Sequence, residues 1–236
     1  IMAANNEVGT IQPIAEIARI IAEYKKSLGR GGDKPPFLHA DACQAAGALN
    51  LPKLIAAGVD LLTLNAGKIY GPKGIGLLYI REKVRLSPLF YGGGQEHKRR
   101  SGTENIPAIV GLAKALELAA THREKESERL TQLRHRLWEG LQKNIPNLTL
   151  NGPACAPAST PRLPNNLNLI VKGVEGEILL MRLDQAGIYA SAGSACTAGS
   201  TEPSHVLRAM GISKQDAYSA VRFSLGKSNT KEQIDE

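Results

Sequence analysis

The sequence predicts an α/β protein in which a mainly parallel sheet covered by helices precedes a smaller α+β domain. Short apolar runs at 37–42, 61–64 and 75–80 alternate with helical patterns, as the strands of parallel sheets do. A helical pattern then runs from about residue 105 to residue 144, which is long enough to connect two domains. Beyond it, strand and helix patterns follow in a different order, and this change favours a second domain.

Each element expected in the first domain has a local reason. Pro13 is typical of a first helical turn, and the apolar residues after it share one face until the glycines at 29–32 end the pattern. The expected elements that follow are a strand at Phe37–Ala42, a helix at Leu51–Ala57, and buried strands at Leu61–Leu64 and Ile75–Ile80. Ligands bind at the carboxyl ends of such strands, so the residues just after them are the first candidates for a site.

The long helix sets the expected domain boundary. Asn105 is expected to cap it, and its charged middle at 121–129 is expected to bend or break it. We therefore expect one domain at residues 1–122 and a second at 123–236. The strands expected in the second domain are Asn166–Val171, Ile188–Ala192 and Ala220–Ser224.

The composition argues against several classes of protein. Hydrophobic residues make up 42% of the 236 residues, enough for a core, yet no apolar run approaches the roughly 18 residues of a membrane-spanning helix. The net charge is +7, but aromatic residues amount to only 4% and form no stripe with the basic ones, so nucleic acid is not an expected partner. The basic run Lys98–Arg100 is either a solvated loop or a contact for a phosphate-bearing ligand or an acidic partner.

The cysteines and the chain ends suggest where the protein works and how much of it is present. Three widely spaced cysteines form neither a disulfide framework nor a zinc-ligand pattern, and no secretory signal is visible, so we expect a cytoplasmic protein. The chain opens at Ile1 without a domain edge and ends in a helix that begins after its cap at Thr230. We therefore expect a fragment of a longer protein.

Two candidate catalytic residues follow neighbouring strands. Asp41 is either a cap for the turn after it or an anionic partner for a ring nitrogen or a metal, and no metal-ligand spacing lies nearby. Lys68, in a Gly-rich turn, is either solvated or an imine-forming nucleophile. This arrangement is the one that pyridoxal phosphate requires, because the carboxylate keeps the pyridinium protonated and the lysine holds the aldehyde as a Schiff base.

Cys196 is the strongest candidate for a working thiol. It lies in a run of small residues from 191 to 200 that offers almost nothing to pack against, as reactive thiols in accessible loops do. Cys43 and Cys155 are instead expected to be structural, the first in the core and the second in a loop.

Three polar features remain open from spacing alone. Arg222 lies within an apolar strand and is either part of a structural salt bridge or a bidentate clamp on a substrate carboxylate. The polar clusters Asn5-Asn6-Glu7 and Arg100–Thr103 carry no spacing that assigns them a role.

Six stretches together resemble the cysteine desulfurases of the NifS/IscS-like group, in the class V (fold type I) aminotransferase superfamily. In the family's order they are Ala4–Gly9, His39–Gln44, Gly67–Gly74, Arg100–Thr103, Ser194–Thr197 and Val221–Gly226. The resemblance implies a pyridoxal-phosphate sulfurtransferase that converts L-cysteine to L-alanine and keeps the sulfur as a persulfide. The sulfur would go to an acceptor or scaffold protein for iron–sulfur cluster assembly or tRNA thiolation. The fold implied is a fold type I cofactor-binding large domain, incomplete here, and a small C-terminal domain that carries the cysteine loop.

The resemblance also implies roles for residues around the cofactor. Lys68 would hold the cofactor aldehyde and Asp41 would pair with the ring nitrogen. Asn6 and Gln44 would bond the phenolic oxygen of the cofactor. Thr103 would reach the cofactor phosphate of the other subunit, so a homodimer is implied.

For the substrate, the resemblance implies two residues. Arg222 would hold the carboxylate of L-cysteine. Cys196 would attack the substrate sulfur and carry the persulfide, and the small residues around it would form a tether for that delivery.

Two departures from the family pattern stand out. The family has a serine and a histidine for the cofactor phosphate where this chain has Asn65 and Gly67, so Asn65 is the candidate donor and Gly67 offers only its backbone. Family members also carry a segment upstream of Asn6, and we expect the family's activity from the longer protein.

The alternative functions are those of a selenocysteine lyase or another class V aminotransferase-like enzyme, and of a catalytically silent sulfur-transfer module.

Overall fold

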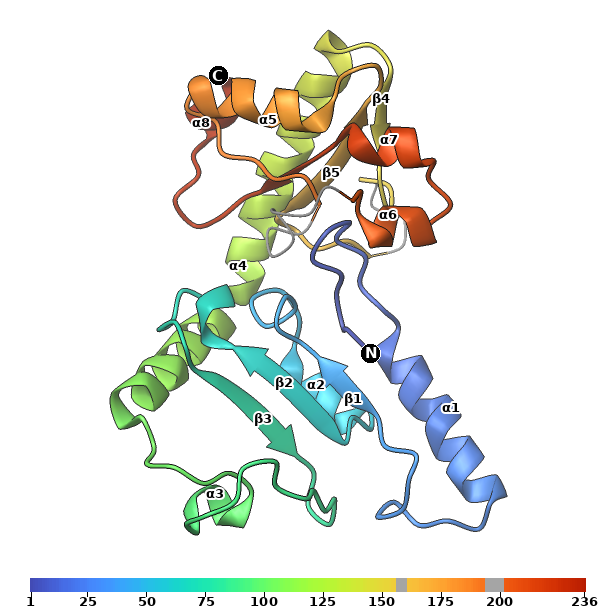
Figure 1. The fold of residues 1–236 in the computed structure, drawn as a ribbon, viewed down its shortest axis with the longest axis vertical. Coiled ribbons are helices and arrows are strands. Elements are labelled where there is room, and N and C mark those ends of the chain that lie inside the picture. Colours follow the sequence, from blue (N-terminus) through green and yellow to red (C-terminus); the bar gives the residue numbers. More distant parts are fainter. Residues whose placement is uncertain (156–160, 194–201) are drawn as a thin grey trace. The chain divides into compact units, whose positions relative to one another are not determined.

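The structure is a computed structural model that describes residues 1–155, 161–193 and 202–236. These residues form two compact units (Figure 1). The first consists of Ile1–Ala3 and Gln12–Arg123, and the second of Ala4–Ile11 and Glu124–Glu236. The boundary between Arg123 and Glu124 falls inside the long helix α4, Ile106–Asn144, and the segment Ala4–Ile11 belongs to the unit formed by the C-terminal half of the chain.

The first unit contains a three-stranded sheet in the order β1-β2-β3. Strand β1, His39–Asp41, runs parallel to β2, Leu61–Asn65, and β2 runs antiparallel to β3, Gly76–Ile80. On the other side of β1, Met2 forms a parallel bridge with Asp41, and the Ala3 N–H donates to the Asp41 carbonyl at 2.7 Å. Residues at the start of the chain therefore extend the parallel part of this sheet.

Besides the first half of α4, the first unit contains one long helix, α1, Ile14–Ser27, and several short ones. The others are α2, Leu51–Ala56, capped by the Asn50 side chain, the 3-10 helix η1, Ala66–Lys68, and α3, Gln95–Lys98. The core of this unit is made of buried apolar residues from the strands and the loops next to them: Leu38, Ala40, Val59, Leu62, Leu64 and Ile69.

The last strand of this sheet differs from the expectation of a buried strand at 75–80. In β3 the Leu77 and Leu78 side chains are 39% and 44% exposed, and the strand is antiparallel to its neighbour. An apolar run predicts a strand, but which of its faces is covered depends on the elements packed against it. The expectation of burial was therefore wrong, while that of a strand is confirmed.

Helix α4 is continuous over all 39 of its residues. Its cap is confirmed, because the Asn105 side chain accepts a hydrogen bond from the Ala108 N–H at 3.3 Å. No break occurs in the charged middle, where Arg129 pairs with Glu126 at 2.7 Å on the helix surface. Such pairs three or four residues apart support a polar helical stretch, so charge alone does not interrupt the helix.

The second unit contains an antiparallel sheet in the order β4-β5-β6. Strands β5, Asn166–Val171, and β6, Ala220–Ser224, confirm the predicted bounds, and β4, Leu148–Leu150, was not predicted. The strand expected at 188–192 is reduced to one bridge between Ser191 and Arg222. The helices of this unit are α5 (Gly176–Gln185), α6 (His205–Ala209), α7 (Lys214–Tyr218) and α8 (Lys231–Asp235).

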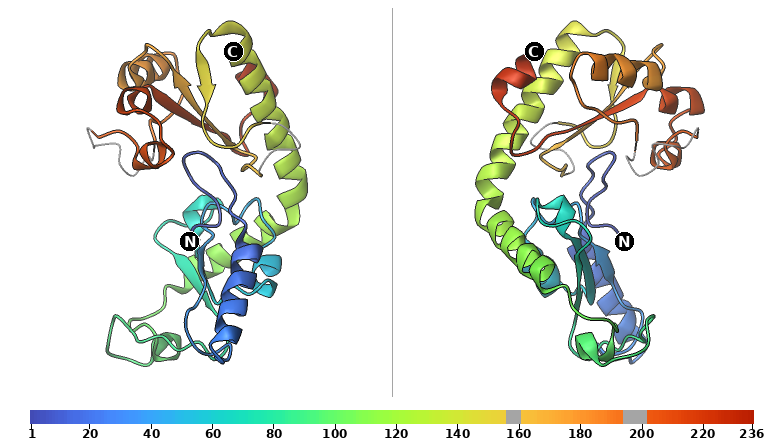
Figure 2. Two further views of the ribbon diagram at one scale, coloured as in Figure 1. Left: turned by 90° about the vertical axis from the view of Figure 1, so that its right-hand side faces the viewer. Right: turned by 60° about the vertical axis from the view of Figure 1, so that its left-hand side comes forward.

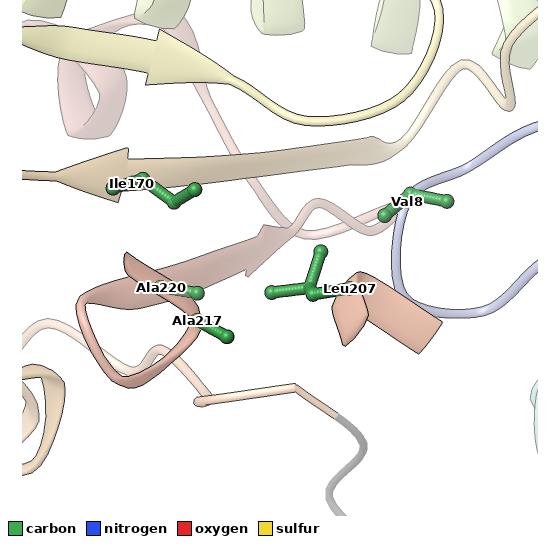
Figure 3. Packing of buried hydrophobic residues seen from close by; sticks show 5 residues of the cluster. All are labelled: Val8, Ile170, Leu207, Ala217 and Ala220. Atoms are coloured by element: carbon green, nitrogen blue, oxygen red, sulfur yellow. The ribbon is translucent and has the colours of Figure 1, made fainter. Parts of the chain in front are cut away.

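Both faces of the central strand β5 are covered. On one face Leu167 and Leu169 pack with Val221 and with leucines of α4 and α5, and Figure 2 shows α4 along this sheet. On the other face Ile170 packs with Leu207, Ala217, Ala220 and Val8, which comes from the N-terminal segment (Figure 3). This second cluster explains why residues 4–11 belong to the second unit.

Two further findings concern what the described residues lack. In the ranges 1–155, 161–193 and 202–236, no helix is both long and apolar enough to cross a lipid bilayer. Within the same ranges, no group of three or more His, Cys, Asp or Glu side chains is arranged to hold a metal ion.

Candidate functional site

Three predicted site residues of the first unit lie at or just after the ends of parallel strands. The register pairs Asp41, the last residue of β1, with Thr63 of β2, and Asn65 ends β2 two residues later. Lys68 follows as the last residue of η1. Because the carboxyl ends of parallel strands lie at one edge of a sheet, Asp41, Asn65 and Lys68 lie at the same edge. His39 is near them, with its Nε2 at 2.7 Å from the Thr63 Oγ1.

Asp41 organises the turn that follows its strand. Its Oδ1 accepts a hydrogen bond from the Cys43 N–H at 3.0 Å, and the Ala42 N–H donates to the Thr63 carbonyl at 2.9 Å. The side chain itself is exposed. The capping interpretation of Asp41 is therefore correct, and the exposed carboxylate is still placed where a ligand can meet it.

Asp41 and Lys68 both affect the pKa of the Cys43 thiol. Burial, a hydrogen bond to Asp41 and the negative charge of Asp41 raise the pKa of the Cys43 thiol to about 12, and the positive charge of Lys68 opposes that rise. Both charged groups therefore lie within electrostatic reach of one half-buried thiol. An anion and a cation are thus brought together at the carboxyl edge of the sheet.

The raised pKa predicts that Cys43 resists alkylation. With a pKa of about 12, the thiol stays protonated at pH 8, and only the thiolate is a good nucleophile. We expect iodoacetamide to modify Cys43 at least about a hundredfold more slowly than an ordinary cysteine with a pKa of about 8.5. Timed alkylation followed by peptide mass mapping measures this rate. Labelling of Cys43 as fast as that of a free peptide cysteine would contradict the prediction.

The turn that carries Lys68 is held in place by its neighbours. The Asn65 Oδ1 accepts from the Gly67 N–H at 2.8 Å and caps η1. After Lys68, which is exposed, Ile69 is buried and the Gly71 N–H donates to the Ala66 carbonyl at 2.9 Å. A side chain at Gly71 would come within 3.0 Å of Ala66 and Ala115. The lysine therefore projects from a turn that is fixed on both sides.

The remaining predicted residues of the first unit lie in two different places. Gln44 is half-buried in the turn directly after Asp41. Thr103 is exposed on a separate loop, where the Ser101 Oγ donates to the Gly93 carbonyl at 3.0 Å. Lys98, which ends α3, and Arg99 and Arg100 after it are all exposed, which agrees with the solvated interpretation of this basic run.

In the second unit the structure brings Arg222 and Asn6 together. The Arg222 Nη1 donates to the Asn6 carbonyl at 3.1 Å, and Asn166 also donates to that carbonyl, at 3.3 Å. The Arg222 backbone forms a bridge with Ser191, with N–O distances of 3.0 and 2.6 Å. Arg222 therefore connects β6, the N-terminal segment and residues 188–193, which are far apart in the sequence.

Glu7, in the second unit, was not predicted to have a role. Glu7 is only 2% exposed, and its carboxylate accepts a hydrogen bond from the Ser204 hydroxyl. The only sequence signal was its place in the polar cluster Asn5-Asn6-Glu7. Cys196 lies outside the described residues.

The comparisons with known proteins place the chain in a family. Residues 1–236 match the aminotransferase class-V family, so the chain belongs to that family. Cysteine desulfurase IscS of Clostridium botulinum is 45% identical over 235 residues, covering 100% of this chain and 56% of the relative. The IscS of Methanosarcina thermophila is 48% identical over 237 residues, with 100% and 54% covered.

A solved structure gives the same assignment for the fold. The structure of a NifS-like protein superimposes with a TM-score of 0.82 at 38% identity, covering 100% of this chain and 57% of that one. The predicted α/β class and the resemblance to the NifS/IscS-like group are thereby confirmed. The chain spans slightly more than half the length of the relatives it matches.

Proposed function

We propose that this chain contributes the catalytic lysine, the working cysteine and the substrate arginine of a pyridoxal 5′-phosphate-dependent cysteine desulfurase. The observation that carries the proposal is the convergence of Asp41 and Lys68 at one sheet edge, where both affect the titration of Cys43. The names of the relatives, cysteine desulfurase IscS, support this activity rather than that of a selenocysteine lyase. An intact set of Asp41, Lys68 and Arg222 argues against a catalytically silent module.

The donor set of the first unit fits the cofactor. Asp41 supplies an exposed carboxylate for a protonated ring nitrogen, and Lys68 supplies an exposed amine for an aldehyde. Half-buried Gln44 lies next to them for the phenolic oxygen, a role it would share with Asn6. When bound, the cofactor supplies an electron sink for the carbon skeleton of the substrate.

Asn65 and Gly67 act as a pair on the phosphate side. The Asn65 Oδ1 is already engaged by the Gly67 N–H, so its amide NH₂ is the group that would donate to a phosphate. A Cβ at position 67 would lie 3.2 Å from the Asn65 Oδ1. A side chain at position 67 would therefore crowd the Asn65 Oδ1 that caps η1, and this crowding favours glycine at position 67.

In the proposed reaction the protein's own groups bind the substrate and move the protons. The Arg222 guanidinium binds the L-cysteine carboxylate, and the Lys68 Nζ takes a proton from the substrate and returns one to the product. The Cys196 thiolate attacks the substrate sulfur, and an S–S bond forms as the C–S bond breaks. The electron pair of the broken bond goes to the substrate carbon, which is protonated to give L-alanine, and the persulfide remains on Cys196.

A homodimer is part of the proposal. Exposed apolar side chains flank the loop that carries Thr103: Leu89 is 88% exposed, Phe90 60% and Val110 61%. Large apolar side chains exposed on both sides of this loop in the sequence support an interface here. Thr103 would lie at this interface and reach the cofactor phosphate of the other subunit.

The proposed function also assigns the protein its domains, a compartment and a sulfur acceptor. Residues 1–122 would be the C-terminal part of the cofactor-binding large domain, and residues 123–236 the small domain with the cysteine loop. A working thiol on Cys196 needs a reducing compartment, which supports a cytoplasmic location. The persulfide would serve a sulfur-acceptor or scaffold protein in iron–sulfur cluster assembly or tRNA thiolation.

The test uses the purified protein reconstituted with pyridoxal 5′-phosphate. With L-cysteine we expect L-alanine in solution and a mass increase of one sulfur atom on the peptide that contains Cys196. Cys196→Ala is expected to keep the cofactor absorbance and to lose the persulfide. Its sulfide release should fall by at least about a hundredfold, because the attacking nucleophile is gone. Unchanged sulfide release in this variant would contradict the proposal.

A further inference from the structure

The buried carboxylate of Glu7 has no part in the proposed chemistry. It lies in the segment Ala4–Ile11, next to Asn6, and is only 2% exposed. Among the residues the structure describes, it forms no ion pair with a lysine, an arginine or a histidine. An ionised group that is buried without a cation costs free energy, so its position calls for a reason other than charge pairing.

The backbone of Glu7 is held rigidly. The Asn5 Oδ1 accepts from the N–H groups of Glu7 and Val8, both at 2.9 Å. The Glu7 carbonyl accepts from the Nδ2 atoms of Asn166 and Asn168 on β5, at 3.0 and 3.1 Å. These hydrogen bonds of the Glu7 backbone fix the loop to β5, the central strand of the second unit, independently of the Glu7 side chain.

The Glu7 side chain binds a residue on one side of residues 194–201 and lies beside a glycine on the other side. Its Oε2 accepts a hydrogen bond from the Ser204 hydroxyl, and Ser204 also caps helix α6 through the Leu207 N–H at 3.2 Å. The same Oε2 lies 3.3 Å from the position that a Cβ on Gly193 would occupy. Gly193 has φ of +65°, a conformation that favours glycine. Gly193 and Ser204 thus flank residues 194–201, one on each side.

The same loop also contacts the arginine assigned to the substrate. The Asn6 carbonyl accepts from the Arg222 Nη1 at 3.1 Å, and the Arg222 backbone pairs with Ser191, two residues before Gly193. One short loop thus connects the substrate arginine with both flanks of residues 194–201. All of these residues belong to the second unit.

We propose that Glu7 is a positioning residue for sulfur transfer, whose carboxylate binds Ser204 and fills the space beside Gly193, next to the loop that carries Asn6. This inference rests on the proposed function. The length of the Glu7 side chain is what matters: it lets the carboxylate bind Ser204 after residues 194–201 and pack beside Gly193 before them, so that both flanks keep their place relative to Arg222. A misplacement of about 1 Å at a reacting group can cost up to about a hundredfold in rate, so loose ends slow the attack of the thiol.

Three substitutions of Glu7 separate the effect of its side-chain length from that of its charge. Glu7→Gln keeps the length and an acceptor oxygen but removes the charge. Glu7→Asp keeps the charge and shortens the side chain by one methylene, and Glu7→Ala removes both. Glu128→Ala, at an exposed position of α4 in the same unit, is the matched control.

Two measurements are made on the protein reconstituted with pyridoxal 5′-phosphate. The first is hydrogen–deuterium exchange of peptides covering 188–193 and 202–209, which needs no turnover. The second is the single-turnover rate of persulfide formation on Cys196, compared with the apparent affinity for L-cysteine.

We expect Glu7→Asp and Glu7→Ala to increase exchange at both flanks and to slow persulfide formation by about tenfold or more, with the affinity for L-cysteine changed by less than about threefold. Glu7→Gln and Glu128→Ala are expected to stay within about threefold of the parent protein in both measurements. If Glu7→Asp behaves like the parent protein while Glu7→Gln fails, charge matters rather than reach, and the inference is overturned. Unchanged exchange at both flanks in Glu7→Ala and Glu7→Asp also overturns it. A parent protein that forms no persulfide sinks the proposed function instead, and the exchange measurement still decides whether Glu7 holds the two flanks.

Discussion

Replacing Lys68 by alanine is expected to abolish covalent attachment of pyridoxal 5′-phosphate and to lower alanine formation by at least about a thousandfold. The amine is lost both as the nucleophile that holds the aldehyde and as the group that moves the substrate proton, and proton transfer alone is worth about 10²–10⁴-fold. The turn around Lys68 is held by the Asn65 cap and by the close packing of Gly71, so the exposed side chain can be removed without disturbing it.

Borohydride reduction followed by peptide mapping measures the attachment. In the parent protein the pyridoxyl adduct should be confined to Lys68, and Lys68→Ala should carry none. Lys73→Ala is the matched control, because Lys73 is an exposed lysine of the same Gly-rich stretch. Lys68→Arg keeps a positive charge but forms no imine, so it should behave like the alanine variant. An adduct of undiminished yield in Lys68→Ala would place the attachment elsewhere and contradict the proposed site.

Replacing Arg222 by lysine is expected to raise KM for L-cysteine by about 10- to 100-fold, because a lysine cannot form the two parallel hydrogen bonds that a guanidinium makes with a carboxylate. The expected change in kcat is smaller, since Arg222 binds the part of the substrate that does not react. Some loss in kcat is also expected, because Arg222 donates to the Asn6 carbonyl and so helps to hold that loop.

The methyl ester of L-cysteine, which has no carboxylate, separates these two effects. The KM for the ester should be nearly the same in the parent protein and in Arg222→Lys, whereas the KM for L-cysteine should differ. Arg182→Lys, at an exposed arginine of α5, should leave both values unchanged. Equal increases in KM for the acid and the ester would show that Arg222 does not bind the carboxylate.

Much of the local structure follows from short-range patterns. The strands at 166–171 and 220–224 have the predicted bounds, because each is a short apolar run with turn residues at both ends. The caps at Asn105 and Thr230 were predictable, since a side chain that accepts from the first helical N–H groups needs only its own neighbours. The order of Asp41 and Lys68 after successive strands was also visible in the sequence, and it pointed to the cofactor.

Packing between distant segments was not predictable in the same way. The exposure of β3 depends on what covers each face of its sheet, which an apolar run does not report. Strand β4 is only three residues long and its pattern is too short to recognise. Residues 188–192 resembled a strand but form only one bridge, with Arg222.

The candidate site also combines features that short-range patterns predict with features that depend on packing. The residue types for the chemistry could be recognised without a structure, namely a carboxylate and an amine after adjacent strands, an arginine in an apolar strand and a cysteine among small residues. The packing of Ala4–Ile11 with the C-terminal half of the chain, through Val8 in the core and Asn166 on the Glu7 carbonyl, became visible only in the folded molecule. The physical reason is that caps and strand patterns depend on neighbours in the sequence. The position of Glu7 between Gly193 and Ser204 instead depends on contacts across nearly 200 residues, which arise only when the core forms.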